Sequence, residues 1–447
     1  MRPLFPLQLP IPILKPILLK FIVFAALVSV VNGQRVPVRG GLGVPIEQPA
    51  RPSVVKVDPE DRIPVRILPQ ASPPPEFSAA SLKEISAFWQ GMMSDYQLPG
   101  AAIAIVQPDG AVLELCVGKR NIQQDAEIDA DTIFNLGPST LAFTTLLAAT
   151  ADRPDNPIFS RTAASVSPLF RMTDARAQRS CQISDLLTMT AGVPGYTDDI
   201  FDPQWARPED VFALLGQAPV MSPPGSRYRH SQISATVGGY LTAMVIGNRN
   251  RSLYSNFIDV MQEQLIDPIG MKSATFSNQK AQATENTATG HVPAEFSYDP
   301  AYPEINERHP LTPLLGLKLS LNDAVRWLQT ELMQGITPGG KRIASAVSVR
   351  ERWQPATVQG SAHVGLGWSR QYHEETEIIM ATGSEGRQTA AIGLYPGYRT
   401  GFVVLTNAES EDASRLIEAV SLGFAEVLKD SRHQAQSPAI AHESTEP

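Results

Sequence analysis

Apolar residues near residue 80 recur at the intervals of a helix: Leu82, Ile85, Phe88 and Met92. Ser81 and Glu84 have the spacing of a capping box, which predicts that the helix begins there. Leu98-Pro99-Gly100 would end it, because proline and glycine interrupt helical hydrogen bonding. Two apolar runs follow, at residues 101–106 and 111–117. The turn sequence between them predicts a β-hairpin.

The rest of the pattern places a long helical stretch between two groups of strands. Residues 140–150 form an apolar helix, and mostly helical and loop-rich sequence continues to about residue 345. Strand patterns then return in four segments: Val364–Ser369, Glu377–Met380, Thr389–Tyr395 and Thr400–Thr406. Pro396-Gly397 turns the last pair, and a helix from about Asp412 follows. Strands from both ends could therefore complete one antiparallel sheet with helices packed on it, an α+β fold.

The first 33 residues have the pattern of a signal peptide. Positive charges precede an apolar run, Phe21–Val31, and small or modest side chains lead to Gly33. This run is shorter than the roughly 20 apolar residues of a membrane span. We therefore expect cleavage near Gly33 and secretion. The alternative is an uncleaved segment that anchors the protein in a membrane.

The remaining boundaries follow from composition. Residues 34–77 are rich in proline and predict a linker or loosely packed arm, whereas 78–430 form the organised domain. Residues 431–447 are polar and predict a disordered tail. Asn250 begins an Asn-Arg-Ser glycosylation sequon, which fits a secreted chain. Cys116 and Cys181 could form a disulfide or remain buried free thiols, and the apolar surroundings of Cys116 favour free thiols.

Charge and residue clustering exclude several classes of function. The net charge of -8 leaves no basic stripe for nucleic acid. Cysteine and histidine are not clustered at metal-ligand spacing, so we expect no metal site and no cofactor. The acidic stretch His373–Glu377 favours a surface turn over a cation site. The run Arg227–His230 could bind a carboxylate or phosphate, although such a short polar run is typical of a solvated loop.

Several segments together resemble the serine β-lactamase-related family, in the branch of class C-type lactamases, D,D-peptidases and esterases. The matching segments run in the family's order: Leu98–Ala102, Asp131–Gly137, Ile183–Pro194, Pro224-Gly225, Asp267–Met271, Gly365–Trp368 and Val403–Asn407. The resemblance covers about residues 80–430. It implies a β-lactamase/transpeptidase-like fold, in which an antiparallel sheet flanked by helices receives strands from both chain ends. A mostly helical lobe is inserted between them, and the active site lies between lobe and sheet.

The resemblance also implies acyl transfer through a Ser-x-x-Lys pair, in which the lysine one helical turn away activates the serine. In this chain the nucleophile position holds Pro138 and the lysine position holds Leu141. No lysine occurs between Lys119 and Lys272, so a shifted alignment does not recover the pair. Proline is compatible with the first turn of a helix, where its missing N–H would be unpaired. The helix can therefore persist without the chemistry.

The two supporting motifs depart from the family as well. His230 and Gln232 occupy the tyrosine and asparagine positions of the second motif. Ala381 replaces the usual lysine or histidine of the third motif, whereas Thr382 and Gly383 keep the geometry of the strand edge. These changes predict a secreted pseudoenzyme. Its partner would be an unidentified small molecule or protein in the cleft beside the lobe.

Two other hypotheses remain open. A rewired serine hydrolase could use Ser139 or Ser231 with His230, which can carry a proton near neutral pH. Against Ser139, a shift of one residue turns a side chain by about 100° around a helix. A structural or assembly role is the third possibility.

Overall fold

An antiparallel sheet of eight strands, in the order β2-β1-β12-β11-β10-β9-β8-β7, forms the centre of the fold. The strands are β1 Gly100–Gln107, β2 Gly110–Gly118, β7 Thr357–Gln359, β8 Ala362–Val364, β9 Ser369–His373, β10 Thr376–Glu385, β11 Gln388–Tyr395 and β12 Thr400–Thr406. The pairing of Ala101 with Thr406 joins β1 to β12. This confirms the prediction that strands from both parts of the chain share one sheet.

The computed structural model describes residues 73–195, 207–295, 297–302, 309–359 and 362–436. All of them belong to one unit that starts at Pro64. The predicted signal peptide, most of the proline-rich arm and residues 437–447 lie outside these ranges. Within these ranges no helix is both long and apolar enough to span a membrane.

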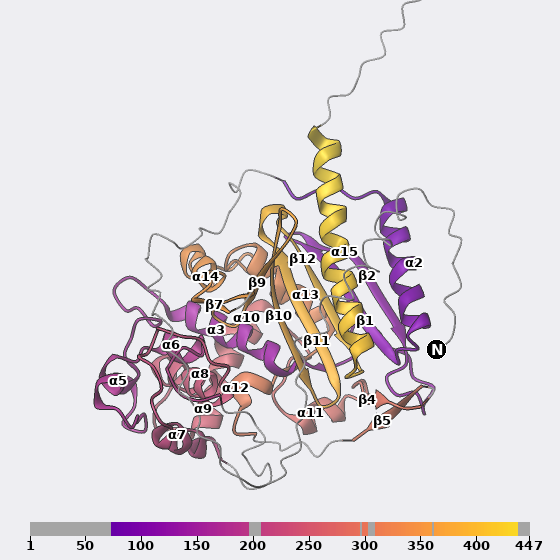
Figure 1. Cartoon of the computed structure of the whole chain (residues 1–447). Coiled ribbons are helices and arrows are strands. Elements are labelled where there is room, and N and C mark those ends of the chain that lie inside the picture. Colours follow the sequence, from indigo (N-terminus) through magenta and orange to yellow (C-terminus); the bar gives the residue numbers. More distant parts are fainter. Residues whose placement is uncertain (1–72, 196–206, 296, 303–308, 360–361, 437–447) are drawn as a thin grey trace, which may run out of the picture. The chain divides into compact units, whose positions relative to one another are not determined.

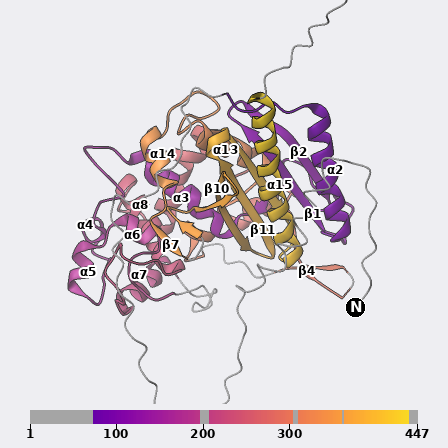
Figure 2. The ribbon, with the colours of Figure 1, turned by 45° about the horizontal axis from the view of Figure 1, so that its top comes forward.

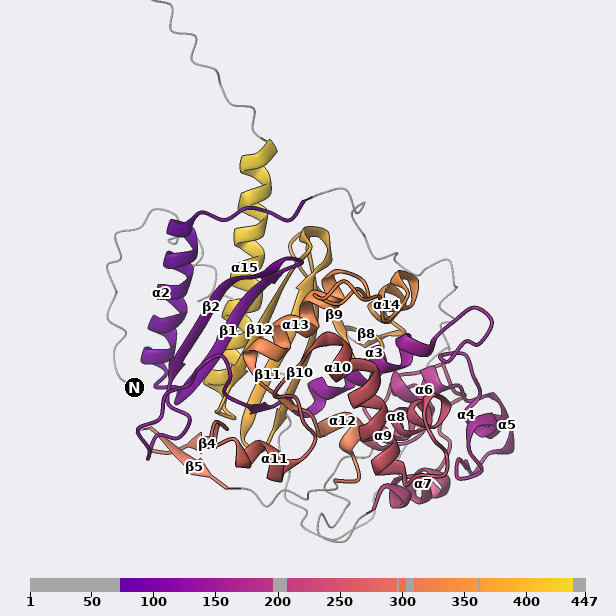
Figure 3. The ribbon, with the colours of Figure 1, turned by 180° about the vertical axis from the view of Figure 1, so that it is seen from behind.

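Both faces of the sheet are buried, because successive side chains of a strand point to opposite sides. In β1, Ala101 and Ile103 join one apolar cluster, and Ala102 and Ala104 join another. Helices α2 (Ala79–Asp95) and α15 (Glu411–Gln436) cover the first face (Figure 1). Figure 3 shows α13 (Leu321–Leu332) and α3 (Thr140–Ala151) on the opposite face. The sheet is therefore the middle layer of three.

A helical lobe is inserted between β2 and the later strands, and its helices gather on one side of the sheet (Figure 2). Its helices and those that follow are α4 Ala163–Val166, α5 Ala175–Ser180, α6 Ile183–Leu187, α7 Pro208–Gln217, α8 Gln232–Ile246, α9 Leu253–Met261, α10 Asp267–Ile269, α11 Asn278–Ala283, α12 Thr312–Leu315 and α14 Ala346–Arg352. Helix α8 is the central helix of the lobe, because nearly all its side chains are buried and it contacts α3, α6, α7, α9 and α12.

Short strands and single turns complete the described structure. Strand β3 (Phe134–Asn135) pairs with β6 (Lys318–Leu319), and β4 (Gly290–Pro293) pairs with β5 (Tyr298–Ala301). The single turns are η2 Gly137–Ser139, η4 Gln262–Ile266 and η5 Pro396–Tyr398. The turn η2 leads directly into α3. It therefore fixes where α3 starts relative to the sheet.

Two sequence predictions of local structure are wrong. Helix α2 is capped by Ser78, whose Oγ accepts the Ser81 N–H at 3.1 Å, rather than by a box of Ser81 and Glu84. The predicted strand Val364–Ser369 is two strand ends with a turn between them. There the Gly365 N–H donates to the Trp368 carbonyl at 2.8 Å. Gly367 lies within this turn and has a φ of +78°, which glycine adopts without strain.

Two predicted boundaries differ from the structure. Helix α15 continues to Gln436, so residues 431–436, expected in the tail, are helical. Near the other boundary, the Gln107 amide donates to the Pro75 carbonyl at 2.8 Å, and the Phe77 ring lies 5.4 Å from that of Phe424. The last residues of the predicted arm therefore contact the domain.

The two cysteines are both free thiols, which confirms the prediction made from the apolar surroundings of Cys116. Cys181 is fully buried, whereas Cys116 is only half-buried, contrary to the expectation of two buried thiols. Burial raises the pKa of the Cys116 thiol to about 11, so it is protonated at neutral pH.

Candidate functional site

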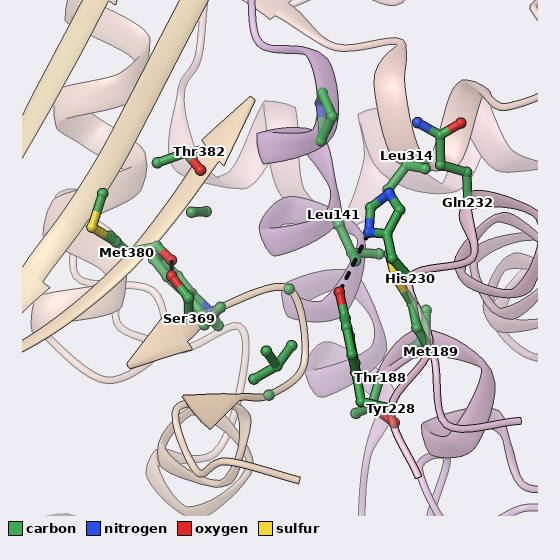
Figure 4. A pocket seen from close by; sticks show the side chains of 17 residues that line it. Leu141, Thr188, Met189, Tyr228, His230, Gln232, Leu314, Ser369, Met380 and Thr382 are labelled. Atoms are coloured by element: carbon green, nitrogen blue, oxygen red, sulfur yellow. Dashed lines mark hydrogen bonds between the residues drawn. The ribbon is translucent and has the colours of Figure 1, made fainter. Parts of the chain in front are cut away.

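A cavity of about 230 Å³ lies beside the start of α3, between β10 and the inserted lobe. Its walls come from η2 and α3, from α6 and the loop before α8, from α12, and from the turn between β8 and β9. In Figure 4, Thr382 of the strand lies across this space from His230 and Tyr228 of the lobe. The cavity therefore lies where the resemblance places the family's active site.

Close packing of β10 against η2 sets the position of one wall. A Cβ atom on Gly383 would lie 2.6 Å from the Leu136 carbonyl oxygen and 2.7 Å from the Pro138 nitrogen. Gly137 has a φ of +53°, and a Cβ atom there would lie 2.9 Å from the Ser384 carbonyl carbon. Neither contact leaves room for a side chain, so both glycines are required by the approach of the strand to the turn.

Pro138 and Leu141 line the cavity, whereas Ser139 does not. Pro138 occupies the first turn, where no helical hydrogen bond needs its missing N–H. The Ser139 side chain is 1% exposed, and its Oγ has no hydrogen-bond partner among the described residues. Ser139 therefore lies one position along the helix from the cavity wall, with its hydroxyl enclosed.

His230 lies at the mouth of the cavity, where its Nδ1 is 3.3 Å from the Tyr228 hydroxyl (Figure 4). Partial burial lowers the pKa of the imidazole below its ordinary value, so the ring is neutral at neutral pH. Burial also raises the pKa of the Tyr228 phenol, which remains protonated. The pair is uncharged and can exchange a hydrogen bond with a ligand at the mouth.

Ser231 and Gln232 form the start of α8. The Ser231 Oγ accepts the Ser234 N–H at 3.4 Å, and the Ser231 N–H points to the Met189 sulfur at 3.4 Å. Ser231 is 1% exposed, so its hydroxyl serves as a helix cap. Gln232 lines the cavity, and its Oε1 is buried without a partner among the described residues.

The third group of candidate residues lies along β10. Ala381 is buried and lines the cavity next to Met380, whereas Thr382 is exposed at the mouth. Gly383 follows at the contact with η2. The structure thus brings Pro138, Leu141, His230, Gln232, Ala381 and Thr382 around one cavity.

A buried ion pair beneath the cavity was missed by sequence reasoning. Arg352 donates to Glu331 at 2.8 Å, and both side chains are 0% exposed. The guanidinium also donates to the Ala142 carbonyl of α3 at 2.7 Å and to the Thr145 Oγ1 at 3.1 Å. Thr145 in turn donates to the Leu366 carbonyl at 2.9 Å. This network fixes the turn between β8 and β9 against α3.

The environment of Glu331 opposes its ionisation. Burial raises the pKa of its carboxyl, and the facing guanidinium works against that rise. The Trp353 indole N–H donates to its second oxygen at 3.2 Å. A glutamate on the otherwise buried face of an amphipathic helix was the only sequence signal for this pair.

Three further sequence candidates lie away from the cavity. Asn250 is exposed in the loop between α8 and α9, an accessible position for a sequon. In the acidic turn, Glu374 pairs with Lys429, and His373 lies 2.6 Å from Glu426. In the part of the chain that the structure describes, no three His, Cys, Asp or Glu residues converge as a metal site.

The layered fold and the position of this cavity are those of a β-lactamase/transpeptidase-like protein. Residues 85–423 match the Beta-lactamase family, and the chain belongs to it. The octameric penicillin-binding protein homologue from Pyrococcus abyssi has the same fold. It superposes with a TM-score of 0.63 at 18% identity, over 76% of this chain and 77% of that one.

Three curated relatives are similar at low identity. Penicillin-binding protein 4 of Amycolatopsis lactamdurans is 25% identical over 72% of this chain and 85% of its own length. The unguisins hydrolase of Aspergillus violaceofuscus is 23% identical over 70% of this chain, and Protein flp of Staphylococcus aureus strain MW2 is 21% identical over 76%. The matches span 59% and 65% of those two relatives. The relatives support the family and leave this chain's activity open.

Proposed function

We propose that this protein is a pseudoenzyme of the Beta-lactamase family, which binds a ligand without forming a covalent bond to it. The observation that carries the proposal is the pair of residues at the start of α3 that line the cavity, Pro138 and Leu141. The resemblance to the family's motifs assigns these positions to the nucleophile and its base. Proline has no attacking group, and leucine cannot accept a proton. The cavity itself supports a retained binding site.

The side chains around this pair support the same proposal. Ala381 of β10 has no hydrogen-bonding group where the family carries lysine or histidine. His230 lies within reach of the Tyr228 hydroxyl. Among the described residues, no serine hydroxyl forms a hydrogen bond with the His230 imidazole. An acyl-transfer reaction requires a nucleophile, a base and donors in one place. Among the described hydroxyl groups that line the cavity, that of Tyr228 is within hydrogen-bond distance of His230, whereas the Ser369 hydroxyl donates to the Met380 carbonyl.

The rewired-hydrolase alternative is less well supported by the geometry. Ser139 and Ser231 are each only 1% exposed, and neither lines the cavity. The Ser231 hydroxyl accepts a helix-capping hydrogen bond from the Ser234 N–H. A substrate carbonyl could reach either oxygen only after the start of α3 or of α8 moved.

Covalent labelling tests the proposal. A fluorophosphonate and a β-lactam are incubated with the full chain, and intact mass is measured. We expect no adduct on the unmodified protein. We also expect little adduct on the Pro138→Ser or Leu141→Lys variant, because the effects of catalytic residues that act as a unit are strongly non-additive. The double variant should acylate weakly at most. A stoichiometric adduct that disappears in Ser139→Ala or Ser231→Ala would establish the hydrolase instead.

We also propose that the protein is secreted after cleavage near Gly33. The charged start, the short apolar run and the exposed sequon at Asn250 support this route. The mass of the mature chain tests the proposal. A secreted chain should lack the first 33 residues, whereas a membrane-bound chain beginning at Met1 would contradict it.

A further inference from the structure

We infer that the cavity binds an uncharged, mainly apolar small molecule of about the size of two fused aromatic rings, and that it discriminates against anions and cations. The inference rests on the proposed non-covalent function and adds the chemical class of its ligand. It follows from the charges around the cavity, its volume, and the place of its polar groups.

The walls of the cavity offer no counter-charge. Among the described residues that line it, none is aspartate, glutamate, lysine or arginine. Leu141, Met189 and Trp368 are each less than a tenth exposed, belong to one buried cluster and supply an apolar floor. A charged group moved from water to such a surface loses its hydration without gaining a partner, which costs several kcal/mol.

Two buried guanidinium groups beside the β8–β9 turn do not replace that missing charge. Arg352 lies beneath the Trp368 ring, 6.0 Å from its centroid, and is 0% exposed. Its donors already serve Glu331, Ala142 and Thr145. Arg370 is 2% exposed and pairs with Glu377. A ligand carboxylate in the cavity therefore finds both groups covered and engaged.

The volume sets the size of the ligand. An apolar cavity of about 150 Å³ is known to hold benzene. The cavity here, about 230 Å³, is larger by roughly one further ring. Met189 lies on the lobe wall, and the flexible thioether side chain of methionine adapts to the outline of a ligand.

Two of the polar groups that line the cavity lie at its mouth, whereas Thr188 and Gln232 are buried. Thr382 and His230 are exposed there, on the strand side and the lobe side (Figure 4). The threonine hydroxyl and the imidazole can each form one hydrogen bond to an uncharged polar atom. The ligand therefore places its rings inward and a hydroxyl, ester or amide at the opening.

Three probes of equal size test the inference: 2-naphthalenemethanol, 2-naphthoate and 2-naphthylmethylammonium. Binding to the full chain is measured by isothermal titration calorimetry at neutral pH. We expect the alcohol to bind at least about tenfold more tightly than either ion. Equal affinities, tighter binding of an ion, or no binding of the alcohol would each overturn the inference. None of these results depends on covalent labelling. The labelling experiment therefore tests the proposed function independently of this inference.

Two variants place the binding in the cavity. Ala381→Leu fills part of the floor, and we expect it to weaken the binding of the alcohol by about tenfold or more. Leu169→Ala is the control, because Leu169 is 46% exposed and does not line the cavity. It should leave the affinity unchanged. If Ala381→Leu binds like the unmodified protein, the alcohol occupies another surface and the inference is wrong.

A charge added at the mouth gives an independent check. Thr382→Lys alters an exposed residue, so the fold should tolerate it. The added ammonium should improve binding of 2-naphthoate relative to the alcohol by about fivefold or more, since it supplies the missing counter-charge. An unchanged ratio would contradict the assignment of Thr382 to the mouth.

Discussion

Asp185 lies in α6, whose last residue, Leu187, lines the cavity. Its Oδ2 accepts the Gln182 N–H at 2.8 Å and so caps the helix. Burial nevertheless dominates and raises the pKa of the carboxyl from 3.8 to about 6. The residue is thus partly protonated in mildly acidic solution, which links the stability of one cavity wall to pH.

We predict that Asp185→Asn stabilises the protein at neutral pH and has little effect near pH 4. Between the unfolded pKa and about 6, the folded state binds more protons, so the free energy of unfolding falls as pH rises through that window. Asparagine keeps the capping acceptor and removes the titration. The gain above pH 6 should be on the order of 1–2 kcal/mol, because residual solvent contact reduces the full effect.

Urea unfolding at several pH values measures this difference. Asp210→Asn is the matched control, since Asp210 caps α7 through the Arg207 N–H at 2.7 Å but has a side chain that is 41% exposed. A difference between Asp185→Asn and the unmodified protein that stays constant with pH would show that the carboxylate is not desolvated.

At the residue scale, the sequence identified which residues line the site more successfully than it identified the residues they contact. Pro138, Leu141 and His230 were placed beside the cavity because each stands in a recognisable motif. The contact of His230 with Tyr228 and the pairing of Glu331 with Arg352 depend on how loops and separate helices meet. That geometry is not encoded in the spacing of residues along the chain.

Strands and helices were predicted where the apolar pattern is strong. The first hairpin, α3, β11 and β12 agree with the structure, and β1, α3, β11 and β12 are buried over most of their length. The end of β10 was missed, because its burial alternates beyond Ala381 and the apolar run stops there. The split between β8 and β9 was missed because a tight turn interrupts an otherwise apolar segment.

At the scale of elements we predict that Gly383→Ala weakens the junction of β10 with η2. Its methyl group would lie 2.6–2.7 Å from backbone atoms of Leu136, Pro138 and Ser139, which cannot rotate away. We expect a loss of about 1–3 kcal/mol in the free energy of unfolding, as for other overpacked sites. The affinity of the cavity for naphthalenemethanol should fall with it.

Gly423→Ala is the control for this substitution. Gly423 lies within α15, and a Cβ atom there would meet nothing within 4 Å. The methyl group should therefore stabilise the helix by about 0.5–1 kcal/mol. Chemical denaturation of both variants provides the comparison. Equal effects of the two would mean that β10 does not approach η2 as closely as the structure has it.

For the whole molecule we predict one cooperative unfolding transition. A single buried cluster includes Ala102 and Val403 of the sheet together with Tyr240 and Phe257 of the inserted lobe. Neither part retains a complete core without the other. Circular dichroism and tryptophan fluorescence should therefore give the same urea midpoint. Two resolved transitions, or protected amides in α8 after those of β1 have exchanged, would contradict this.

The pairing of β1 with β12 has a consequence for synthesis on the ribosome. Ala101 and Thr406 are neighbours in the sheet but are about 300 residues apart along the chain. At translation rates of about 5–20 residues per second, β12 emerges roughly 15–60 s after β1. During that interval the inserted lobe is already outside the exit tunnel, while the first hairpin exposes an unpaired edge. The nascent chain must keep this edge apart from other chains until its last strand arrives.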